Sequence, residues 1–381
     1  MTFADELGAL PFDRLLDVAT GATPQRVSAA LDASPIDRTL YDFAALLSPA
    51  AGDRLEDLAR ASRDLTIARF GRTMHMYAPL YLSNECLTTC AYCGFARELP
   101  IARKTLTPEE TLAEARHLLR QGFRSILLLT GEHERLTGVE FLEQRVRLLA
   151  DEVPQLSIEV QVWSEEEYRR LVAAGCEGTV IYQETYHPET YAKVHIAGRK
   201  RRFEWRLGGP ERAARAGMRR LGIGALLGLH PEWPYEAIAV AAHARFLQRH
   251  YWRSRVSVSV PRLRPSAAGY QPERPVTDRE LTQFVCALRL FLADAGLVLS
   301  TREPPAFRDG LLQVGITQVS AGSHTEPGGY ENPKEATEQF EIADYRSPGK
   351  VAVRIRDLGY EPVWEDWARI TPSAERMLAK R

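Results

Sequence analysis

The sequence is sparse in the features that define several large classes of protein, and each gap excludes a class. Only five cysteines occur in 381 residues, which is too few for a disulfide scaffold. No apolar run approaches the length of a membrane span, and the N-terminus (MTFADELGALPFDRLL) lacks the uninterrupted apolar core of a signal peptide. Neither sign of charge is in excess, because 49 Lys and Arg residues face 50 Asp and Glu residues. We therefore expect a cytoplasmic protein with a small-molecule ligand, and neither a nucleic acid nor a membrane as partner.

What the sequence does contain is a regular alternation of short apolar runs with longer amphipathic segments. Residues 1–70 carry apolar residues at helical spacing and predict an N-terminal helical extension. Helix candidates further along include TPEETLAEARHLLRQG, which opens with a threonine cap and an acidic first turn. Eight apolar runs bounded by polar or glycine-rich turns predict strands, at residues 75–83, 125–132, 156–161, 178–185, 223–229, 256–263, 297–303 and 316–323.

Eight strand–helix repeats are typical of a parallel barrel, whose strands are buried on both faces and read as continuous apolar runs. We therefore predict an α/β fold with a parallel (β/α)8 TIM-like barrel over residues 71–330. An open doubly wound sheet is the alternative arrangement. The tail, residues 331–381, is rich in charge, Pro and Gly, and we expect it to cap one end of the barrel.

Three of the five cysteines, Cys86, Cys90 and Cys93, lie in CLTTCAYC directly after the first predicted strand. In parallel barrels the loops that follow the strands form the active-site face. A 4Fe-4S cluster normally takes four thiolates, so three in one loop would leave one iron open for a substrate or cofactor. Cys176 and Cys286 lie elsewhere, on a predicted loop and a predicted helix. A structural zinc site is disfavoured, since zinc sites usually add a second cysteine pair or histidines.

Together with the aromatic Tyr92 before the third cysteine, this loop resembles the hallmark of the radical S-adenosylmethionine (SAM) superfamily. Over residues 40–370 the chain resembles the 2-iminoacetate synthase family, the tyrosine lyases of thiamine thiazole biosynthesis. One departure is that Leu87, Thr88 and Thr89 stand where more polar residues such as Asn or Asp are expected. The resemblance rests on eight segments in order: MYAPLYLSNECLTTCAYCGFAR, LLLTGEH, IYQETYH, IGALLGL, SVSVPRLRP, LSTRE, VSAGSHTEPGGY and PVWEDW.

The resemblance implies a 4Fe-4S cluster held by the three loop cysteines, with SAM bound to the open iron. Glu132, which follows Gly131 after the second predicted strand, resembles the acidic residue that receives the ammonium group of SAM. Tyr92 and Phe95 flank the third cysteine and are candidates to wall the adenine, or to pack the loop.

Gln161, Glu184 and Tyr186 follow the third and fourth predicted strands and are expected to project toward the barrel mouth. A polar side chain after a buried apolar run needs a partner. That partner is either a hydroxyl of the ribose or substrate, or a structural hydrogen-bond network inside the barrel.

The carboxylate of an amino-acid substrate needs a cationic anchor. Arg302, at the end of the seventh predicted strand, is the first candidate, because a guanidinium holds a carboxylate with two hydrogen bonds and stays charged when buried. Ser300 is placed to assist it. Arg262 and Arg264 are rivals, and an ion pair with a neighbouring acid such as Glu303 is the alternative role for any of these arginines.

The reaction implied by the resemblance is cleavage of the Cα–Cβ bond of L-tyrosine to 2-iminoacetate (dehydroglycine) and p-cresol, with SAM converted to 5′-deoxyadenosine and methionine. The delocalised benzylic radical makes tyrosine suitable. The implied partners are thiazole synthase, which takes the hydrolysable imine, and a reductant such as flavodoxin or ferredoxin.

Three other functions compete with this one. The tyrosine lyase of hydrogenase maturation carries a second cysteine-bound cluster in a C-terminal extension. No cysteine follows Cys286 here, which argues against this function. A radical lyase acting on tryptophan or another aromatic amino acid shares the overall pattern, so it stays open. A non-catalytic iron–sulfur or zinc scaffold needs no polar rim, whereas this chain offers one at successive strand ends: Glu132, Gln161, Glu184, Arg264 and Arg302.

Overall fold

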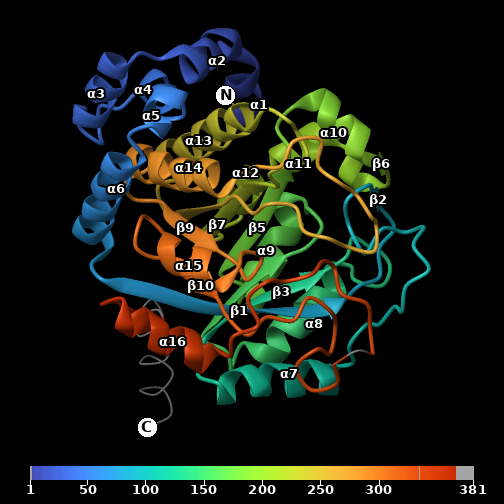
Figure 1. Cartoon of the computed structure of the whole chain (residues 1–381). Helices are drawn as coiled ribbons and strands as arrows, with labels where there is room; N and C mark the ends of the chain where they lie inside the picture. Colours follow the sequence, from blue (N-terminus) through green and yellow to red (C-terminus); the bar gives the residue numbers. More distant parts are fainter. Residues whose placement is uncertain (1, 334, 366–381) are drawn as a thin grey trace.

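The computed structural model describes residues 2–333 and 335–365, and a closed barrel of parallel strands forms its centre (Figure 1). Neighbouring strands pair in the order β10-β9-β8-β7-β5-β4-β3-β1, and the pairing of His75 in β1 with Gln318 in β10 closes the ring. The predicted eight-stranded barrel is confirmed, and the open-sheet alternative is wrong. The barrel strands are β1 (Thr73–Ser83), β3 (Ser125–Thr130), β4 (Gln155–Glu159), β5 (Gly178–Glu184), β7 (Arg220–Ala225), β8 (Arg255–Ser259), β9 (Gly296–Leu299) and β10 (Gln318–Ser320).

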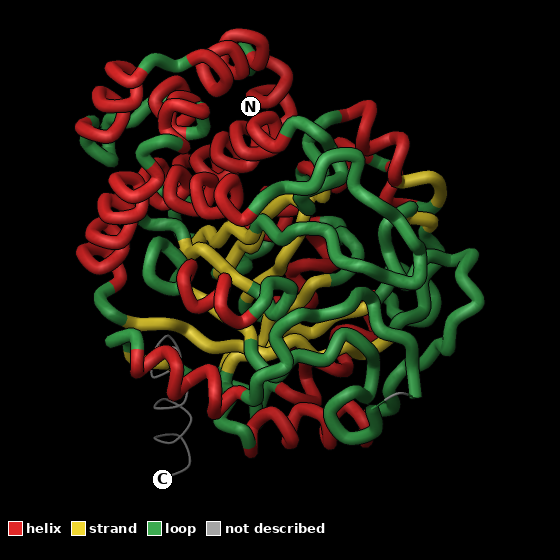
Figure 2. The backbone as a smooth tube through the Cα atoms, viewed as in Figure 1, coloured by secondary structure: helices red, strands yellow, loops and turns green. Residues whose placement is uncertain are grey.

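Helices between consecutive strands form the outer layer of the barrel, as the red coils around the yellow strands in Figure 2 show. Several begin at the capping boxes that the sequence announces: the Thr107 hydroxyl accepts from Glu110 N and the Glu110 carboxylate accepts from Thr107 N. The helices are α7 (Pro108–Arg120), α8 (Val139–Leu149), α9 (Glu165–Ala174), α10 (Pro188–Val194), α11 (Phe203–Leu207), α12 (Gly209–Arg215), α13 (Trp233–His250), α14 (Asp278–Phe291) and α15 (Pro305–Leu311).

Residues 3–70 are helical, as the spacing of their apolar residues predicts, and they cover the α13 and α14 side of the barrel (Figure 1). Phe3 stacks on His243 of α13 with ring centroids 4.0 Å apart. The buried guanidinium of Arg38 donates to the Leu290 carbonyl of α14 at 2.6 Å. These helices are α1 (Phe3–Ala9), α2 (Phe12–Gly21), α3 (Pro24–Asp32), α4 (Leu40–Leu46), α5 (Pro49–Gly52) and α6 (Leu55–Phe70).

The chain after β10 passes first along the C-terminal end of the barrel and then along its N-terminal end. Residues 335–346 cross the loops at the C-terminal ends of the strands, where the Gln339 carbonyl accepts from Gly94 N at 3.1 Å and the Thr301 carbonyl from Ala343 N at 2.9 Å. The chain then returns through α16 (Pro348–Asp357) to β11 (Glu361–Val363), a ninth strand parallel to the start of β1. Residues 366–381, which include the end of the PVWEDW segment, lie outside the described residues.

Side chains do not completely fill the barrel. A cavity of about 490 Å³ is lined near the N-terminal ends of the strands by residues such as Gln155 and Gln318, and further along the barrel by Tyr77 and Tyr182. Most of its lining residues lie at or before the N-terminal ends of the strands, so this space is at the opposite end of the barrel from the loops that follow the strands.

Candidate functional site

The cysteine loop lies at the C-terminal end of the barrel, directly after β1. A short ribbon holds it in shape: β2 (Thr89–Cys90) pairs antiparallel with β6 (His195–Ala197), and Cys90 lies opposite His195. None of the five cysteines, all of which lie in the described part of the chain, forms a disulfide. Cys86, Cys90 and Cys93 are thus together on the face where parallel barrels place their chemistry.

Two neighbouring segments contact this loop. Leu87 N donates to the Glu132 carbonyl at 2.8 Å, and a Cβ on Gly131 would collide with the backbone oxygen of Glu85 and come within 3.0 Å of the Cys86 Cβ. On the other side, Gln339 Nε2 lies 3.6 Å from the Cys93 sulfur. Gly131 is therefore required for close approach of the β3 end to the loop.

The three thiols suit an iron–sulfur cluster. Burial raises the pKa of Cys90 to about 12 and also raises the pKa of Cys93, so a cation must offset the cost of a thiolate there. Thiolates are the usual ligands of iron–sulfur clusters. Among the described residues no group of three His, Cys, Asp or Glu side chains is gathered tightly enough to hold a metal ion, and a cluster spreads its thiolates over separate irons.

Four charged side chains meet beside the cysteine loop. Arg206 Nη1 lies 3.1 Å from Glu132 Oε1, and Lys200 Nζ lies 2.7 Å from Glu184 Oε1. Burial alone would raise the pKa of Glu184, but Lys200 and Arg206 outweigh it and hold the pKa below its usual value. The group is a buried network of two carboxylates and two cations that faces the cofactor end of the barrel.

Glu184 also adopts an unusual backbone conformation. Its φ of 72° lies in the left-handed region, and Glu184 is the only non-glycine residue with a positive φ among the described residues. The pairing of β5 with β7 shifts register at this point, and the Glu184 carbonyl accepts from Leu226 N at 2.7 Å. Strain of this kind persists where the surroundings hold a side chain in a required direction.

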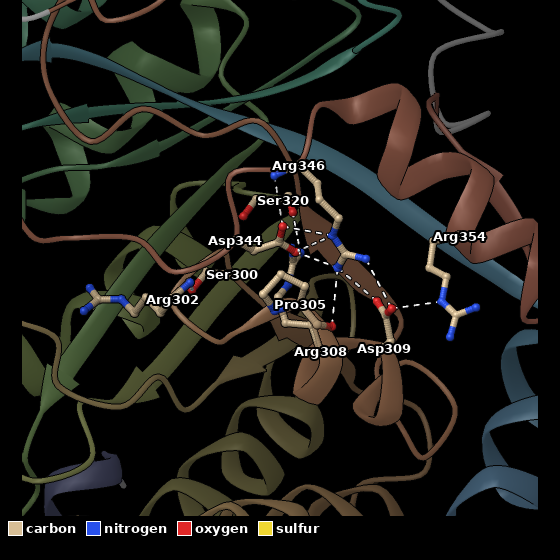
Figure 3. Close-up of polar contacts among 9 residues, drawn as sticks. All are labelled: Ser300, Arg302, Pro305, Arg308, Asp309, Ser320, Asp344, Arg346 and Arg354. Atoms are coloured by element: carbon tan, nitrogen blue, oxygen red, sulfur yellow. Dashed lines mark hydrogen bonds and ion pairs between the residues drawn. The ribbon is translucent and has the colours of Figure 1, made fainter.

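Arg302 lies at the C-terminal end of β9 with its guanidinium 3.4 Å above the centre of the Phe340 ring. In Figure 3 its side chain extends away from the carboxylates of Asp309 and Asp344, which are occupied by Arg308, Arg346 and Arg354. Among the described residues no carboxylate lies within ion-pair distance of Arg302, and Ser300 Oγ lies 3.4 Å from Arg302 N. This arginine is available to a ligand.

The rival arginines have different surroundings. Arg262 forms a two-hydrogen-bond ion pair with Glu303 and also contacts Asp278 at 2.8 Å, so its guanidinium is already neutralised. Arg264 Nε lies 3.5 Å from the Glu341 carbonyl and forms no ion pair within the described part of the chain. The ion pair with Glu303 that the sequence offered as an alternative therefore belongs to Arg262.

Glu159, the last residue of β4, is a site candidate that the sequence analysis missed because it stands inside an apolar run. Burial and the charge of Glu184 raise the pKa of Glu159 to about 7, although Arg302 opposes the shift. Its carboxyl has no hydrogen-bond or ion-pair partner among the described residues, and the residue is partly exposed. Burial, and after it the charge of Glu159, raises the pKa of Tyr77 and of Tyr182, which line the cavity.

The two aromatic residues of the loop lie in different apolar clusters. The Tyr92 hydroxyl and His195 Nε2 are 2.9 Å apart, and the Tyr92 ring packs with Val194 and Leu226. Phe95 packs edge-on against Tyr81, with ring centroids 6.0 Å apart. Both side chains are buried and both contribute to the packing of the loop.

Gln161 and Tyr186 are placed less favourably for contact with a ligand. The Tyr186 hydroxyl bonds His243 of α13 at 2.8 Å, so this side chain lies between the barrel and its outer helices rather than at the mouth. Gln161 Nε2 donates weakly to the Thr137 carbonyl at 3.5 Å, and Gln161 Oε1 is buried with no partner among the described residues. Cys176 and Cys286 are buried away from the loop, before β5 and in α14.

No helix in the described part of the chain is long and apolar enough to cross a membrane. Two family profiles match: the Radical SAM superfamily over residues 80–243, and the Biotin and Thiamin Synthesis associated domain over residues 259–361.

Among curated proteins the chain is similar to 2-iminoacetate synthase of Escherichia coli K12. The two are 43% identical over 96% of this chain and 97% of that protein. The enzyme of the same name from Salmonella typhimurium LT2 is 42% identical, with the same coverage. Among solved structures, HydG, a maturase of the FeFe-hydrogenase, is similar with a TM-score of 0.88 and 28% identity, over 98% of this chain and 82% of that one.

Proposed function

The chain belongs to the 2-iminoacetate synthase family of the radical SAM superfamily, and from this premise we propose that it cleaves L-tyrosine to 2-iminoacetate and p-cresol for the thiazole ring of thiamine. Enzymes of this superfamily use a 4Fe-4S cluster with SAM. When bound, these cofactors supply the 5′-deoxyadenosyl radical that removes a hydrogen atom from the substrate. The protein's task is to bind, orient and exclude water.

Cys86, Cys90 and Cys93 hold the cluster in this proposal, and the buried charge network beside them receives SAM. Glu132 gives one carboxylate oxygen to Arg206 and offers the other to the ammonium group of SAM. Because Gly131 has no side chain, the end of β3 can lie against the cysteine loop, and this close contact would shape the site for SAM. Tyr92 and Phe95 hold the loop in place from either side of Cys93.

Arg302 and Ser300 bind the carboxylate of tyrosine. The main support for this assignment is that Arg302 has no carboxylate partner among the described residues, whereas the charge of Arg262 is neutralised by Glu303. Arg264 lies at the same rim and would contribute to the substrate site from its outer side. With its carboxylate at Arg302, the substrate's ring would extend into the barrel toward Glu159, whose carboxyl is influenced by the charge of Arg302.

Two protein partners follow from this chemistry. The imine product is hydrolysed by water, so direct transfer to thiazole synthase would protect it. Each turnover needs two electrons, one to cleave SAM and one, with a proton, to reduce the 4-hydroxybenzyl radical to p-cresol. A reductant such as flavodoxin or ferredoxin would supply them. In this scheme residues 335–346 help to exclude water by closing over the loops at the mouth.

The test is anaerobic incubation of the reconstituted protein with SAM, dithionite and each aromatic amino acid. With tyrosine we expect equal amounts of 5′-deoxyadenosine and p-cresol, together with glyoxylate from hydrolysis of the imine. Turnover of tryptophan with none of tyrosine would refute the substrate assignment.

A further inference from the structure

Two hydrogen-bond donors reach the sulfur of Cys93 from different parts of the chain. Phe95 N, in the cysteine loop itself, lies 3.5 Å from Cys93 Sγ. Gln339 Nε2 lies 3.6 Å from the same sulfur and belongs to a segment 246 residues further along the chain. The sulfurs of the other two loop cysteines lie 3.0 and 3.7 Å from the Thr88 hydroxyl, which is again part of the loop. The contact of Gln339 is therefore not a product of local loop packing.

The backbone of Gln339 is held on both sides. Gln339 N donates to the Thr325 carbonyl at 2.9 Å, and the Gln339 carbonyl accepts from Gly94 N at 3.1 Å. A Cβ on Gly94 would lie 2.5 Å from that carbonyl oxygen, so only glycine lets the two segments come this close. The segment of Gln339 is thus fixed in place directly beside the third cysteine.

The Tyr81 hydroxyl sets the direction of the Gln339 side-chain amide. It donates to Gln339 Oε1 at 2.8 Å, and the Tyr81 ring is buried in one apolar cluster with Phe95 and Cys93. Burial raises the pKa of Tyr81 well above its usual value, so the hydroxyl keeps its proton and remains a donor. With the amide oxygen engaged by Tyr81, the amide N–H groups are directed at the sulfur.

An N–H donor aimed at a cluster sulfur favours the reduced form of the cluster. The reduced cluster carries one more negative charge than the oxidised cluster, and a hydrogen bond strengthens when its acceptor becomes more negative. Hydrogen bonds to the sulfurs are accordingly one of the factors that set the reduction potentials of iron–sulfur clusters.

We propose that Gln339 raises the reduction potential of the cluster by donating its side-chain amide to the Cys93 sulfur, and that Tyr81 holds the amide in the required orientation. The proposal rests on the proposed function, because it takes the loop cysteines as the ligands of the cluster. Gln339 is a positioning residue in this scheme, since it acts through Cys93.

The test is the midpoint potential of the reconstituted cluster, measured by EPR-monitored redox titration in the absence of SAM. Gln339→Leu removes the donor without adding a charge and should disfavour reduction about tenfold, which is about 59 mV for a one-electron couple. Gln339→Glu still accepts from the Tyr81 hydroxyl but offers the sulfur no N–H donor, so its midpoint potential should also be more negative than that of the wild type.

Tyr81→Phe tests the orientation of the amide. Without the hydroxyl, nothing holds the amide oxygen away from the sulfur, and the midpoint potential should fall part of the way toward that of Gln339→Leu. The double variant Tyr81→Phe/Gln339→Leu should match Gln339→Leu, because Tyr81 acts only through the amide. Shifts that add in the double variant would overturn the role assigned to Tyr81.

The matched control is Asn332→Leu, which replaces an exposed amide in the preceding stretch of chain and should keep the wild-type midpoint potential. A purely structural role for Gln339 predicts loss of iron, with an unchanged potential for the clusters that remain. Wild-type potentials in both Gln339→Leu and Gln339→Glu would therefore overturn the inference.

A second measurement covers the case in which the Gln339 variants do not keep a cluster. Pulsed EPR of the reduced wild type, with ¹⁵N in its glutamine side-chain amides, should show a coupling between the cluster and one amide nitrogen. The control Asn332→Leu should show the same coupling. Its absence from the wild type would overturn the inference without any substitution.

Failure of the proposed function gives different results. If the loop cysteines do not hold the cluster, Cys93→Ala keeps both the iron content and the midpoint potential of the wild type. If the substrate assignment is wrong, the wild type forms no p-cresol from tyrosine, yet the Gln339 variants still shift the midpoint potential.

Discussion

At the residue scale, the arginines of the barrel mouth differ in how their charge is compensated. Arg262 forms ion pairs with Glu303 and Asp278, and Arg308 forms an ion pair with Asp344. The Arg302 guanidinium lies over the Phe340 ring and, among the described residues, has no carboxylate within ion-pair distance. A guanidinium in that setting gains most from an incoming carboxylate.

We therefore predict that Arg302→Ala retains cluster and SAM but binds tyrosine poorly. Loss of one partner of a desolvated charge pair costs about 2–5 kcal/mol, and misplacement of the amine lowers the rate further. The variant should also be uncoupled, forming 5′-deoxyadenosine without matching p-cresol. Quantifying both products decides this: unchanged tyrosine affinity with equal products in Arg302→Ala, but not in Arg264→Ala, would move the role to Arg264.

The cysteines give a second prediction at this scale. Alanine at any one of Cys86, Cys90 and Cys93 should lower the iron content of the reconstituted protein and abolish SAM cleavage, because each supplies one thiolate to the cluster. Cys176→Ala and Cys286→Ala are the matched controls and should keep their iron, since both side chains are buried elsewhere. Iron and sulfide analysis is the measurement, and an iron-loaded Cys90→Ala would contradict the assignment.

At the element scale, the end of β3 must approach the cysteine loop more closely than any side chain permits. We predict that Gly131→Ala lowers both the iron content and the thermal midpoint, because the new methyl meets backbone that cannot move freely. Overpacking of this kind costs roughly 1–3 kcal/mol. The control is Gly310→Ala in α15, where a Cβ meets nothing within 4 Å. Equal iron and equal midpoints in the two variants would show that the close approach is not needed.

The sequence reveals elements according to their length and pattern. All eight barrel strands were predicted because each is an apolar run of several residues between turns, and the capped helix α7 because its signals are local. The ribbon of β2 and β6, and the strand β11, have two or three residues each and show no period. Glu159 was missed for a related reason: a carboxyl inside a strand reads as an interruption of the pattern, and only the closed barrel shows what surrounds it.

At the scale of the whole molecule, buried carboxyls make stability depend on pH. Burial raises the pKa of Glu236 in α13 to about 7, while its side chain accepts hydrogen bonds from the Thr185 hydroxyl and Tyr186 N. In the unfolded chain the same group titrates near 4.5. Between these two values the unfolded chain has lost a proton that the folded chain keeps, so stability falls as pH rises through this window.

We predict that Glu236→Gln becomes more stable relative to the wild type as the pH is raised from about 5 to about 8. The gain should be on the order of 3 kcal/mol, which is what a pKa difference of this size represents. Thermal midpoints measured across this range, with Glu361→Gln on an exposed position as control, provide the check. A constant difference between Glu236→Gln and the wild type at all pH values would show that Glu236 does not carry the effect.

The closure of the barrel through β1 and β10 also constrains how the protein can be made. His75 leaves the ribosome about 240 residues before its partner Gln318, a delay of roughly 10 to 50 s at ordinary rates of bacterial synthesis. Throughout that time β1 presents an unpaired edge made of apolar residues, the kind of edge on which other chains add. Nascent chains therefore depend on protection until residue 320 emerges, and any chain that stops short of β10 keeps the edge open permanently.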